Sequence, residues 1–251
     1  MTDSIAFYRQ VLRALKAADI PFLIGGGYAT ARHTRIDRRV KDLDLMIRRA
    51  DWPDTARALR KVGIHTYLPF PHWLGKAVTT GALVDIIFSS GNAVVAVDDQ
   101  WFERSETTRV LGFTVRLCPP EELLWSKAFI MERERFDGAD VLHLIRAAGR
   151  TLDWKHLCNR FRGHERVLLA HVVIFGYVYP TEADVIPRWV VRHLAKAPIS
   201  APPGVKLCRG TILSRSQYLV DIRKWGYADA RLRPFGRMTL RERSIWTRAI
   251  R

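Results

Sequence analysis

The chain has 251 residues, of which 48% are hydrophobic, so it is long enough to bury a sizeable core in one or two domains. Its cysteines (Cys118, Cys158 and Cys208) are odd in number and lack CxxC spacing, which argues against a disulfide framework and against a zinc site. The longest apolar run, Val167–Tyr179, is too short to span a membrane, and the N-terminus lacks a secretory signal, so we expect a soluble, cytoplasmic protein.

Up to residue 118, predicted helices alternate with predicted strands. Apolar residues at i, i+3 and i+4 spacing predict a first helix that is capped by Ser4 and ends near Ala18. The elements that follow are a short buried strand at 22–24, a glycine turn at 25–27, a helix over 28–34, a strand over 42–47, a helix over 53–62, strands at 64–69, 76–80 and 83–88, and a hairpin over 107–117.

After Pro119 the pattern becomes helical. Helices are predicted over 121–135, 139–147, 154–160, 164–178, 187–194 and 211–225, with a loop at 198–203. The predicted fold class is therefore α+β, with a small mixed β-sheet flanked by helices and then a helical region. We divide the chain into a first domain over 1–118, a helical domain over 119–200, and a linker, helix and basic C-terminal tail over 201–251.

Two aspartates on one predicted strand are the first candidate functional residues. Asp42 and Asp44 are two positions apart, so on a strand their side chains share a face while Leu43 and Leu45 point to the core. Adjacent carboxylates repel each other unless a cation neutralises them. Mg²⁺ is the natural cation, because it prefers hard oxygen ligands and completes its coordination shell with water and phosphate.

Asp85 is the predicted third carboxylate. It interrupts the very apolar strand Leu83–Phe88, where an unpaired ionised side chain would be costly. Either Asp85 lies at an exposed strand end or it joins the metal site. Three carboxylates can hold two Mg²⁺ ions, one for the nucleotide phosphates and one for an attacking hydroxyl, so Asp42, Asp44 and Asp85 are the expected catalytic and metal-binding residues.

Three consecutive glycines form the second candidate element. Gly25, Gly26 and Gly27 lie between a strand and a helix. Glycines let backbone N–H groups approach phosphate oxygens, and a helix N-terminus favours negative charge. The sequence is neither a Walker A loop nor a dinucleotide-binding fingerprint, because the glycines are consecutive and no GK[ST] follows. Strand, glycine turn, helix, Asp-Leu-Asp strand and later strand aspartate together indicate binding of a nucleoside triphosphate (NTP).

The stretch FLIGGGYATARHTRIDRRVKDLDL resembles the core of the nucleotidyltransferase superfamily, a polymerase-beta-like fold. It is most similar to the branch that holds abortive-infection-type toxins and the lincosamide and aminoglycoside nucleotidylyltransferases. The resemblance places the metal-binding pair at Asp42 and Asp44, the third carboxylate at Asp85 and the turn at Gly25 and Gly26. The gap between Gly26 and Asp42 is longer than in minimal members.

Further residues near these elements are candidates for substrate contacts. Arg38 and Lys41 precede the aspartates and either bind triphosphate or form a solvated basic loop. The segment from Cys118 to Lys127 resembles the opening of the helical region in the toxin-like branch, which implies that Lys127 faces the nucleotide. The same resemblance extends to Arg135, Asp137 and Asp140, for which a structural role is favoured.

A short aromatic segment precedes the Asp85 strand. Trp73 either stacks on a base or lies in the core beside a loop residue, His72, and Lys76 is a candidate phosphate ligand.

The leading hypothesis is a metal-dependent enzyme that moves a nucleoside monophosphate from an NTP to an acceptor hydroxyl. The net charge of +16, most of it after residue 118 and in the arginine-rich Ala230–Arg251, favours RNA, especially tRNA, as the acceptor, although such charge also arises from solubility or arginine-rich coding. A small-molecule hydroxyl is the second acceptor considered, and a protein side chain is the third. The toxin-like resemblance implies an antitoxin partner. The rival class is a non-catalytic, basic RNA-binding protein with this fold.

Overall fold

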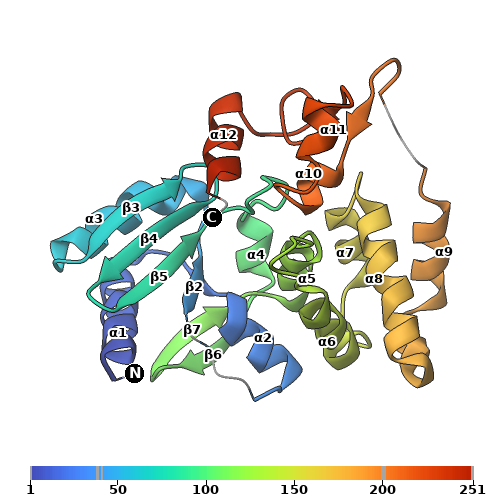
Figure 1. Cartoon of the computed structure of the whole chain (residues 1–251). Coiled ribbons are helices and arrows are strands. Elements are labelled where there is room, and N and C mark those ends of the chain that lie inside the picture. Colours follow the sequence, from blue (N-terminus) through green and yellow to red (C-terminus); the bar gives the residue numbers. More distant parts are fainter. Residues whose placement is uncertain (1, 38–39, 41, 199–201, 250–251) are drawn as a thin grey trace. The chain divides into compact units, whose positions relative to one another are not determined.

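The computed structural model describes residues 2–37, 40, 42–198 and 202–249 (Figure 1). The chain divides into two compact units. The first comprises Met1–Ala31 and Asp37–Pro119, and the second comprises Arg32–Ile36 and Pro120–Arg251. The separation of 119–200 and 201–251 into different domains stays a prediction.

A seven-stranded mixed sheet forms the first unit, with the strand order β3-β4-β5-β2-β1-β7-β6. The pairs β2–β5 and β1–β7 are parallel, whereas β1–β2, the β3-β4-β5 meander and the β6–β7 hairpin are antiparallel. The strands are β1 (Leu23–Ile24), β2 (Leu43–Met46), β3 (His65–Phe70), β4 (Leu74–Thr79), β5 (Ala82–Ile87), β6 (Glu106–Val110) and β7 (Phe113–Leu117). This architecture confirms the predicted α+β class with a mixed sheet.

The helices of this unit are α1 (Thr2–Ala17), the part of α2 (Gly26–Thr34) that precedes Arg32, α3 (Trp52–Lys61) and a short α4 (Asp99–Glu103). Helices α1 and α3 pack on each other. In addition, α1 packs on β5 and α3 packs on β3 (Figure 1). The Trp52 ring of α3 lies so close to Gly75 of β4 that a side chain at Gly75 would overlap it. Helix α4 was not predicted; the Asp98 side chain caps it by accepting a hydrogen bond from the Gln100 backbone N–H at 3.1 Å.

The two central strands show why the aspartates stay accessible. Leu43, Leu45, Val84 and Ile86 are fully buried, because alternate side chains of β2 and β5 point to the helix-covered face. Asp44 and Asp85 alternate with them and are only half-buried. The sheet therefore has one core face and one face on which polar side chains are tolerated.

The second unit is mainly helical, and a two-stranded parallel sheet, β8–β9, adds to it. Its helices are α5 (Pro120–Ala128), α6 (Gly138–Ala148), α7 (Trp154–Arg160), α8 (Glu165–Val178), the 3₁₀ helix η2 (Pro180–Val185), α9 (Arg188–Lys196), α10 (Gly210–Leu213), α11 (Leu219–Arg223) and α12 (Leu240–Arg248). The strands are β8 (Leu207–Cys208) and β9 (Ala228–Asp229). Within the basic C-terminal segment, a capping box formed by Thr239 and Glu242 starts α12.

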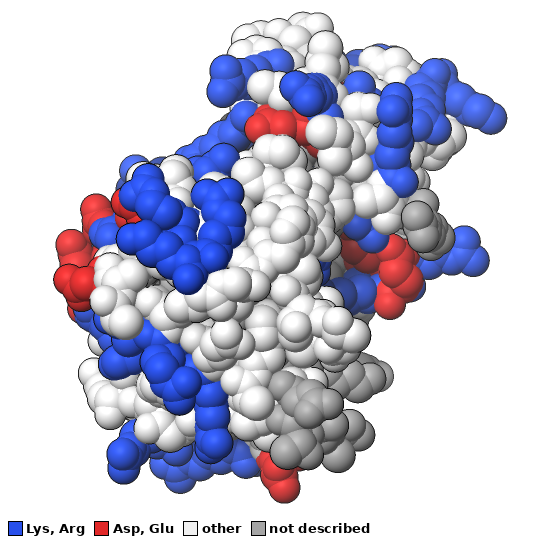
Figure 2. Space-filling view, turned by 90° about the vertical axis from the view of Figure 1, so that its left-hand side faces the viewer, with Lys and Arg blue, Asp and Glu red and all other residues white. Residues whose placement is uncertain are grey.

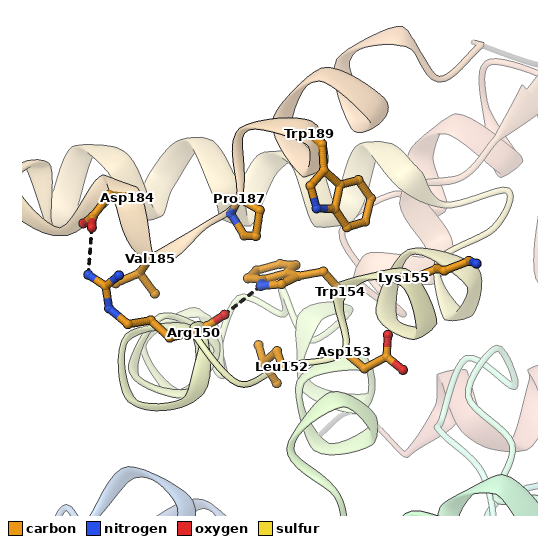
Figure 3. Close-up of a pocket in the computed structure, with 10 residues that line it drawn as sticks. Arg150, Leu152, Asp153, Trp154, Lys155, Asp184, Val185, Pro187 and Trp189 are labelled. Carbon is orange, nitrogen blue, oxygen red and sulfur yellow. Dashed lines mark hydrogen bonds and ion pairs between the residues drawn. The ribbon is translucent and has the colours of Figure 1, made fainter.

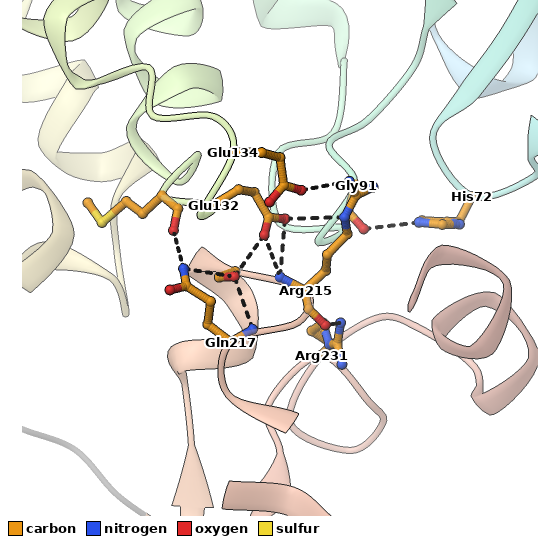
Figure 4. Close-up of polar contacts among 9 residues, drawn as sticks. His72, Gly91, Glu132, Glu134, Arg215, Gln217 and Arg231 are labelled. Carbon is orange, nitrogen blue, oxygen red and sulfur yellow. Dashed lines mark hydrogen bonds and ion pairs between the residues drawn. The ribbon is translucent and has the colours of Figure 1, made fainter. Parts of the chain in front are cut away.

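Two predicted helices were wrong in extent, and one side chain accounts for part of both differences. The helix predicted over 121–135 ends at Ala128, and the one predicted over 211–225 is two short helices. Glu132 lies in the loop after α5 and accepts hydrogen bonds from the Ser214 hydroxyl, at 2.7 Å, and from the Arg215 backbone N–H, at 3.1 Å (Figure 4). Ser214 has extended backbone dihedrals, so the chain leaves the helix there.

A buried ionic cluster joins two helices of the second unit. The fully buried Glu122 of α5 accepts hydrogen bonds from Arg160, at 2.9 Å, and lies 2.7 Å from the His156 ring, both on α7. Because an isolated buried carboxylate would be costly, this pairing fixes how α5 and α7 pack.

Within the described residues, no helix combines the length and apolar character needed to cross a membrane. All three cysteines are buried and free, as their number and spacing predicted.

A pH dependence of stability follows from His171 on α8. Its Nε2–H donates to the Ala128 carbonyl at 2.9 Å, and burial holds the pKa of this histidine below its ordinary value of 6.5. Between the two pKa values the unfolded chain binds a proton that the folded chain does not. We therefore expect the free energy of unfolding to fall as the pH drops below about 6.5, by at most about 1.4 kcal/mol per pH unit for this residue.

Denaturant unfolding at pH 8 and pH 5.5 measures this effect. His171→Gln keeps an N–H donor and should flatten the dependence, whereas the same change at the exposed His193 serves as the matched control. An unchanged slope in His171→Gln would contradict the assignment.

Candidate active site

Asp44 and Asp85 lie directly opposite each other on the neighbouring parallel strands β2 and β5. Residues paired in this way point to the same face of a sheet. Asp42 is exposed at the bend just before β2. The structure therefore places Asp44 and Asp85 side by side on the polar face. Asp42 lies two residues before Asp44, outside the strand.

Lys76, on the next strand of the sheet, lies beside this pair of aspartates. It lies opposite Asp85 on the antiparallel strand β4, and its Nζ donates to Asp85 Oδ1 at 2.6 Å. The side chains of Lys76 and Asp85 are 21% and 23% exposed, so solvent screens the ion pair only partly.

Sequence reasoning named Lys76 as a phosphate ligand and missed its pairing with Asp85. A signal for that pairing was present, because β4 and β5 are joined by the two-residue loop Thr80-Gly81. A two-residue loop fixes the register of a hairpin, and it sets Lys76 opposite Asp85.

The glycine turn contacts Asp44 directly. The Gly25 backbone N–H donates to the Asp44 carbonyl at 2.9 Å. Gly26 opens α2 with φ of +49°, and a Cβ at that position would overlap the Asp44 carboxylate. Helix α2 thus begins two residues earlier than predicted. Its first turn lies against the Asp44 carboxylate, and a helix N-terminus at this position favours binding of an anion together with its cation.

The electrostatics of Tyr8 show that the three aspartates act on one region. Burial raises the pKa of the Tyr8 hydroxyl, and the negative charges of Asp42, Asp44 and Asp85 raise it further, with Tyr28 also contributing. All three carboxylates therefore lie within electrostatic range of a single buried side chain on α1.

The fit of this region to a divalent cation rests on its donor chemistry. Carboxylate oxygens are the ligands that Mg²⁺ prefers, and Asp44 has a second carboxylate opposite it. Among the described residues, no three His, Cys, Asp or Glu side chains are close enough together to form a metal-binding group. Asp44 and the exposed Asp42 offer carboxylates of the kind that hold such a cation, and Asp85 is already paired with Lys76.

The other predicted nucleotide ligands have different outcomes. Arg38 and Lys41 lie outside the described residues. Lys127, in the second unit, is buried and forms ion pairs with Asp137, at 2.9 Å, and with Asp140, at 2.8 Å. Its contact with a nucleotide stays a prediction, and its observed role is to join the end of α5 to the start of α6.

Asp137 forms ion pairs at the junction between α5 and α6. Burial opposes its ionisation, but hydrogen bonds from Arg135 and the charge of Lys127 keep the pKa of Asp137 below its ordinary value. The structural role favoured for this group is therefore the one observed.

The aromatic segment before β4 is structural. Trp73 stacks on Phe70, with ring centroids 5.6 Å apart and planes 15° apart. His72 donates from Nε2 to the Gly91 carbonyl at 3.1 Å (Figure 4). Both contacts hold the loop beside β4 and β5, and Trp73 is half-buried there and not part of the core.

A separate pocket of about 570 Å³ lies in the second unit, between α7, η2 and α9. Trp154 and Trp189 form part of its wall, with Trp154 Nε1–H donating to the Gly149 carbonyl at 2.7 Å (Figure 3). An exposed ion pair between Arg150 and Asp184 borders it. No sequence pattern pointed to this pocket.

Comparisons with known proteins gave one family match and several similar structures. Residues 8–107 match the family model of aminoglycoside-2''-adenylyltransferase, and this range contains the glycine turn and all three aspartates. No curated protein matches. Similar solved structures include the following three. One is the solution structure of the antibiotic-resistance factor ANT(2'')-Ia, which is 16% identical, with 68% of this chain and 97% of that chain covered and a TM-score of 0.48.

The second is the crystal structure of ANT(2'')-Ia in complex with adenylyl-2''-tobramycin, at 17% identity, with 71% and 99% covered and a TM-score of 0.41. The third is an antigenic nucleotidyltransferase-like protein from Paracoccidioides brasiliensis, at 19% identity, with 76% and 97% covered and a TM-score of 0.45. From the family match and the residues that it contains, we conclude that this chain is a nucleotidyltransferase-superfamily enzyme whose first unit resembles the aminoglycoside nucleotidyltransferases.

Proposed function

We propose that the chain transfers a nucleoside monophosphate from an NTP to a hydroxyl group of a small molecule. The observation that carries this proposal is the match over residues 8–107, within which Asp44 and Asp85 are paired across β2 and β5 and Gly26 lies against Asp44. The family that matches is an antibiotic-modifying one. Support for a small-molecule acceptor is therefore stronger than for the RNA acceptor that the charge suggested, and the toxin activity and antitoxin partner stay predictions.

In the proposed reaction, the acceptor oxygen attacks the α-phosphorus of the NTP, the bond to pyrophosphate breaks, and the acceptor proton leaves. Asp42 and Asp44 would hold Mg²⁺, which would neutralise phosphate charge when bound. The Asp85 carboxylate, which pairs with Lys76, accepts the proton. The backbone N–H groups of Gly26 and Gly27, at the start of α2, receive the phosphates.

RNA remains the second candidate acceptor because of one specific observation. Exposed basic residues gather on the α1–α3 side of the molecule, where Lys and Arg are prominent in Figure 2. They are Arg9, Arg13, Lys16, Arg57, Arg60 and Lys61. Such a surface attracts polyanions in a salt-dependent manner.

Incubation with each α-³²P-labelled NTP tests the proposal, with Mg²⁺ and either a small-molecule extract or total tRNA. We expect label in the small-molecule fraction, one pyrophosphate released per transfer, and no transfer after EDTA removes the metal, because the carboxylates then lack their counter-cation. Label only in tRNA would establish the RNA acceptor. Binding of NTP without transfer to either pool would indicate a non-catalytic protein.

A further inference from the structure

Four side chains form one row across the polar face of the sheet. Tyr67 lies opposite Lys76, Lys76 opposite Asp85, and Asp85 opposite Asp44. Neighbouring strands are about 4.8 Å apart, so Tyr67 is about 10 Å from Asp85 along the row. The row runs from the carboxylate pair to the edge strand β3, and an acceptor that reaches Asp85 from that edge crosses Lys76 and Tyr67.

The outer end of this row offers an aromatic surface. Tyr67 is 43% exposed, and its ring stacks on that of His65, with centroids 6.0 Å apart and planes 24° apart. A partly exposed, braced ring presents a flat face on which another ring can pack.

The middle of the row offers unused hydrogen-bond donors. An ammonium group has three N–H donors, and within the described part of the chain the one hydrogen-bond partner of Lys76 Nζ is Asp85. Two donors therefore remain for oxygen atoms of a ligand.

The same surface offers little to a cation. From Val62 to Val97, a range that is described throughout and includes β3, β4 and β5, Asp85 is the single acidic residue, and it is bound to Lys76. The ammonium groups of a polycationic acceptor would find on these strands no carboxylate other than Asp85, which is already paired with Lys76.

Resting on the proposed function, we infer that the acceptor is an anionic hydroxylated ring compound, such as a phosphorylated or carboxylated sugar, and not a polycation. Its ring packs on Tyr67, its anionic group binds Lys76, and its hydroxyl points to Asp85. Lys76 is then the residue that determines acceptor charge.

The first test supplies the enzyme with labelled NTP, Mg²⁺ and three acceptor mixtures in parallel: sugar phosphates and sugar acids, neutral sugars, and aminoglycosides including tobramycin. We expect kcat/KM to be at least about tenfold higher for the anionic mixture than for the aminoglycosides, since one such contact is worth about tenfold. Equal or better transfer to aminoglycosides or neutral sugars overturns the inference and leaves the proposed function intact. Transfer to none of the three overturns both.

The second test replaces Lys76. Lys76→Gln should raise KM for the anionic acceptor about tenfold with little change in KM for the NTP, and Lys76→Arg should restore most of the affinity. The exposed Lys61 of α3 provides the matched control, because Lys61→Gln removes the same charge away from the row. A rise in KM for the NTP instead, or an equal effect of Lys61→Gln, would show that Lys76 does not select the acceptor.

Discussion

Asp44→Asn is expected to lower the rate of nucleotidyl transfer about a thousandfold while the protein stays folded. The change removes one negative charge where a cation must be held against the triphosphate, and losing one such electrostatic contribution typically costs about 10²–10³ in rate. The amide keeps the size of the side chain, so the contact with Gly26 and the pairing of β2 with β5 should persist.

Pyrophosphate release under saturating NTP measures this effect. Asp54→Asn is the matched control, since Asp54 is an exposed aspartate on α3 that pairs with Arg57 away from the polar row. A rate within about tenfold of the unmodified protein would show that Asp44 is not part of the catalytic machinery.

Gly26→Ala is expected to impair both folding and catalysis. At φ of +49° any residue with a side chain is strained, and here the added Cβ would also overlap the Asp44 carboxylate. Gly63 provides a matched control, because its φ is +78° and a Cβ there would meet nothing within 4 Å. Both variants carry backbone strain of about 1 kcal/mol, but only one displaces Asp44.

We therefore expect Gly63→Ala to lower the free energy of unfolding by about 1 kcal/mol with unchanged kcat. Gly26→Ala should lose more stability and at least about a hundredfold in kcat, the cost of a reacting group moved by about 1 Å. Denaturant unfolding and steady-state transfer give the two quantities. Equal behaviour of the two variants would mean that the turn does not position Asp44.

The sequence predicted those parts of the site that depend on local periodicity. Alternation along β2 alone sets Asp44 on the face opposite the buried Leu43 and Leu45, whereas Asp42, predicted to share that strand, lies at the bend before it. The pairing of Asp44 with Asp85 depends on a parallel register between β2 and β5, which are far apart in the chain, and no local pattern specifies it. The pairing of Lys76 with Asp85 was partly predictable. Once β4 and β5 are recognised as strands, the two-residue Thr80-Gly81 loop between them sets these two residues opposite each other.

The errors in the helical region have the same origin. The segments at 121–135 and 211–225 are periodic enough to predict continuous helices. Glu132 bonds to Ser214 and Arg215, more than eighty residues later, and interrupts both. Hydrogen bonds between distant segments override helix propensity, which contributes only tenths of a kcal/mol per residue.

The row from Asp44 to Tyr67 has unequal tolerance to substitution along its length. At its inner end, Asp44 is held by the glycine turn and by the parallel pairing with Asp85, so nearly any replacement there disturbs backbone geometry and charge together. At its outer end, Tyr67 lies half-exposed on an edge strand, where exchanges cost little folding free energy. Acceptor preference can therefore diverge among relatives of this chain while the machinery for phosphate chemistry is retained.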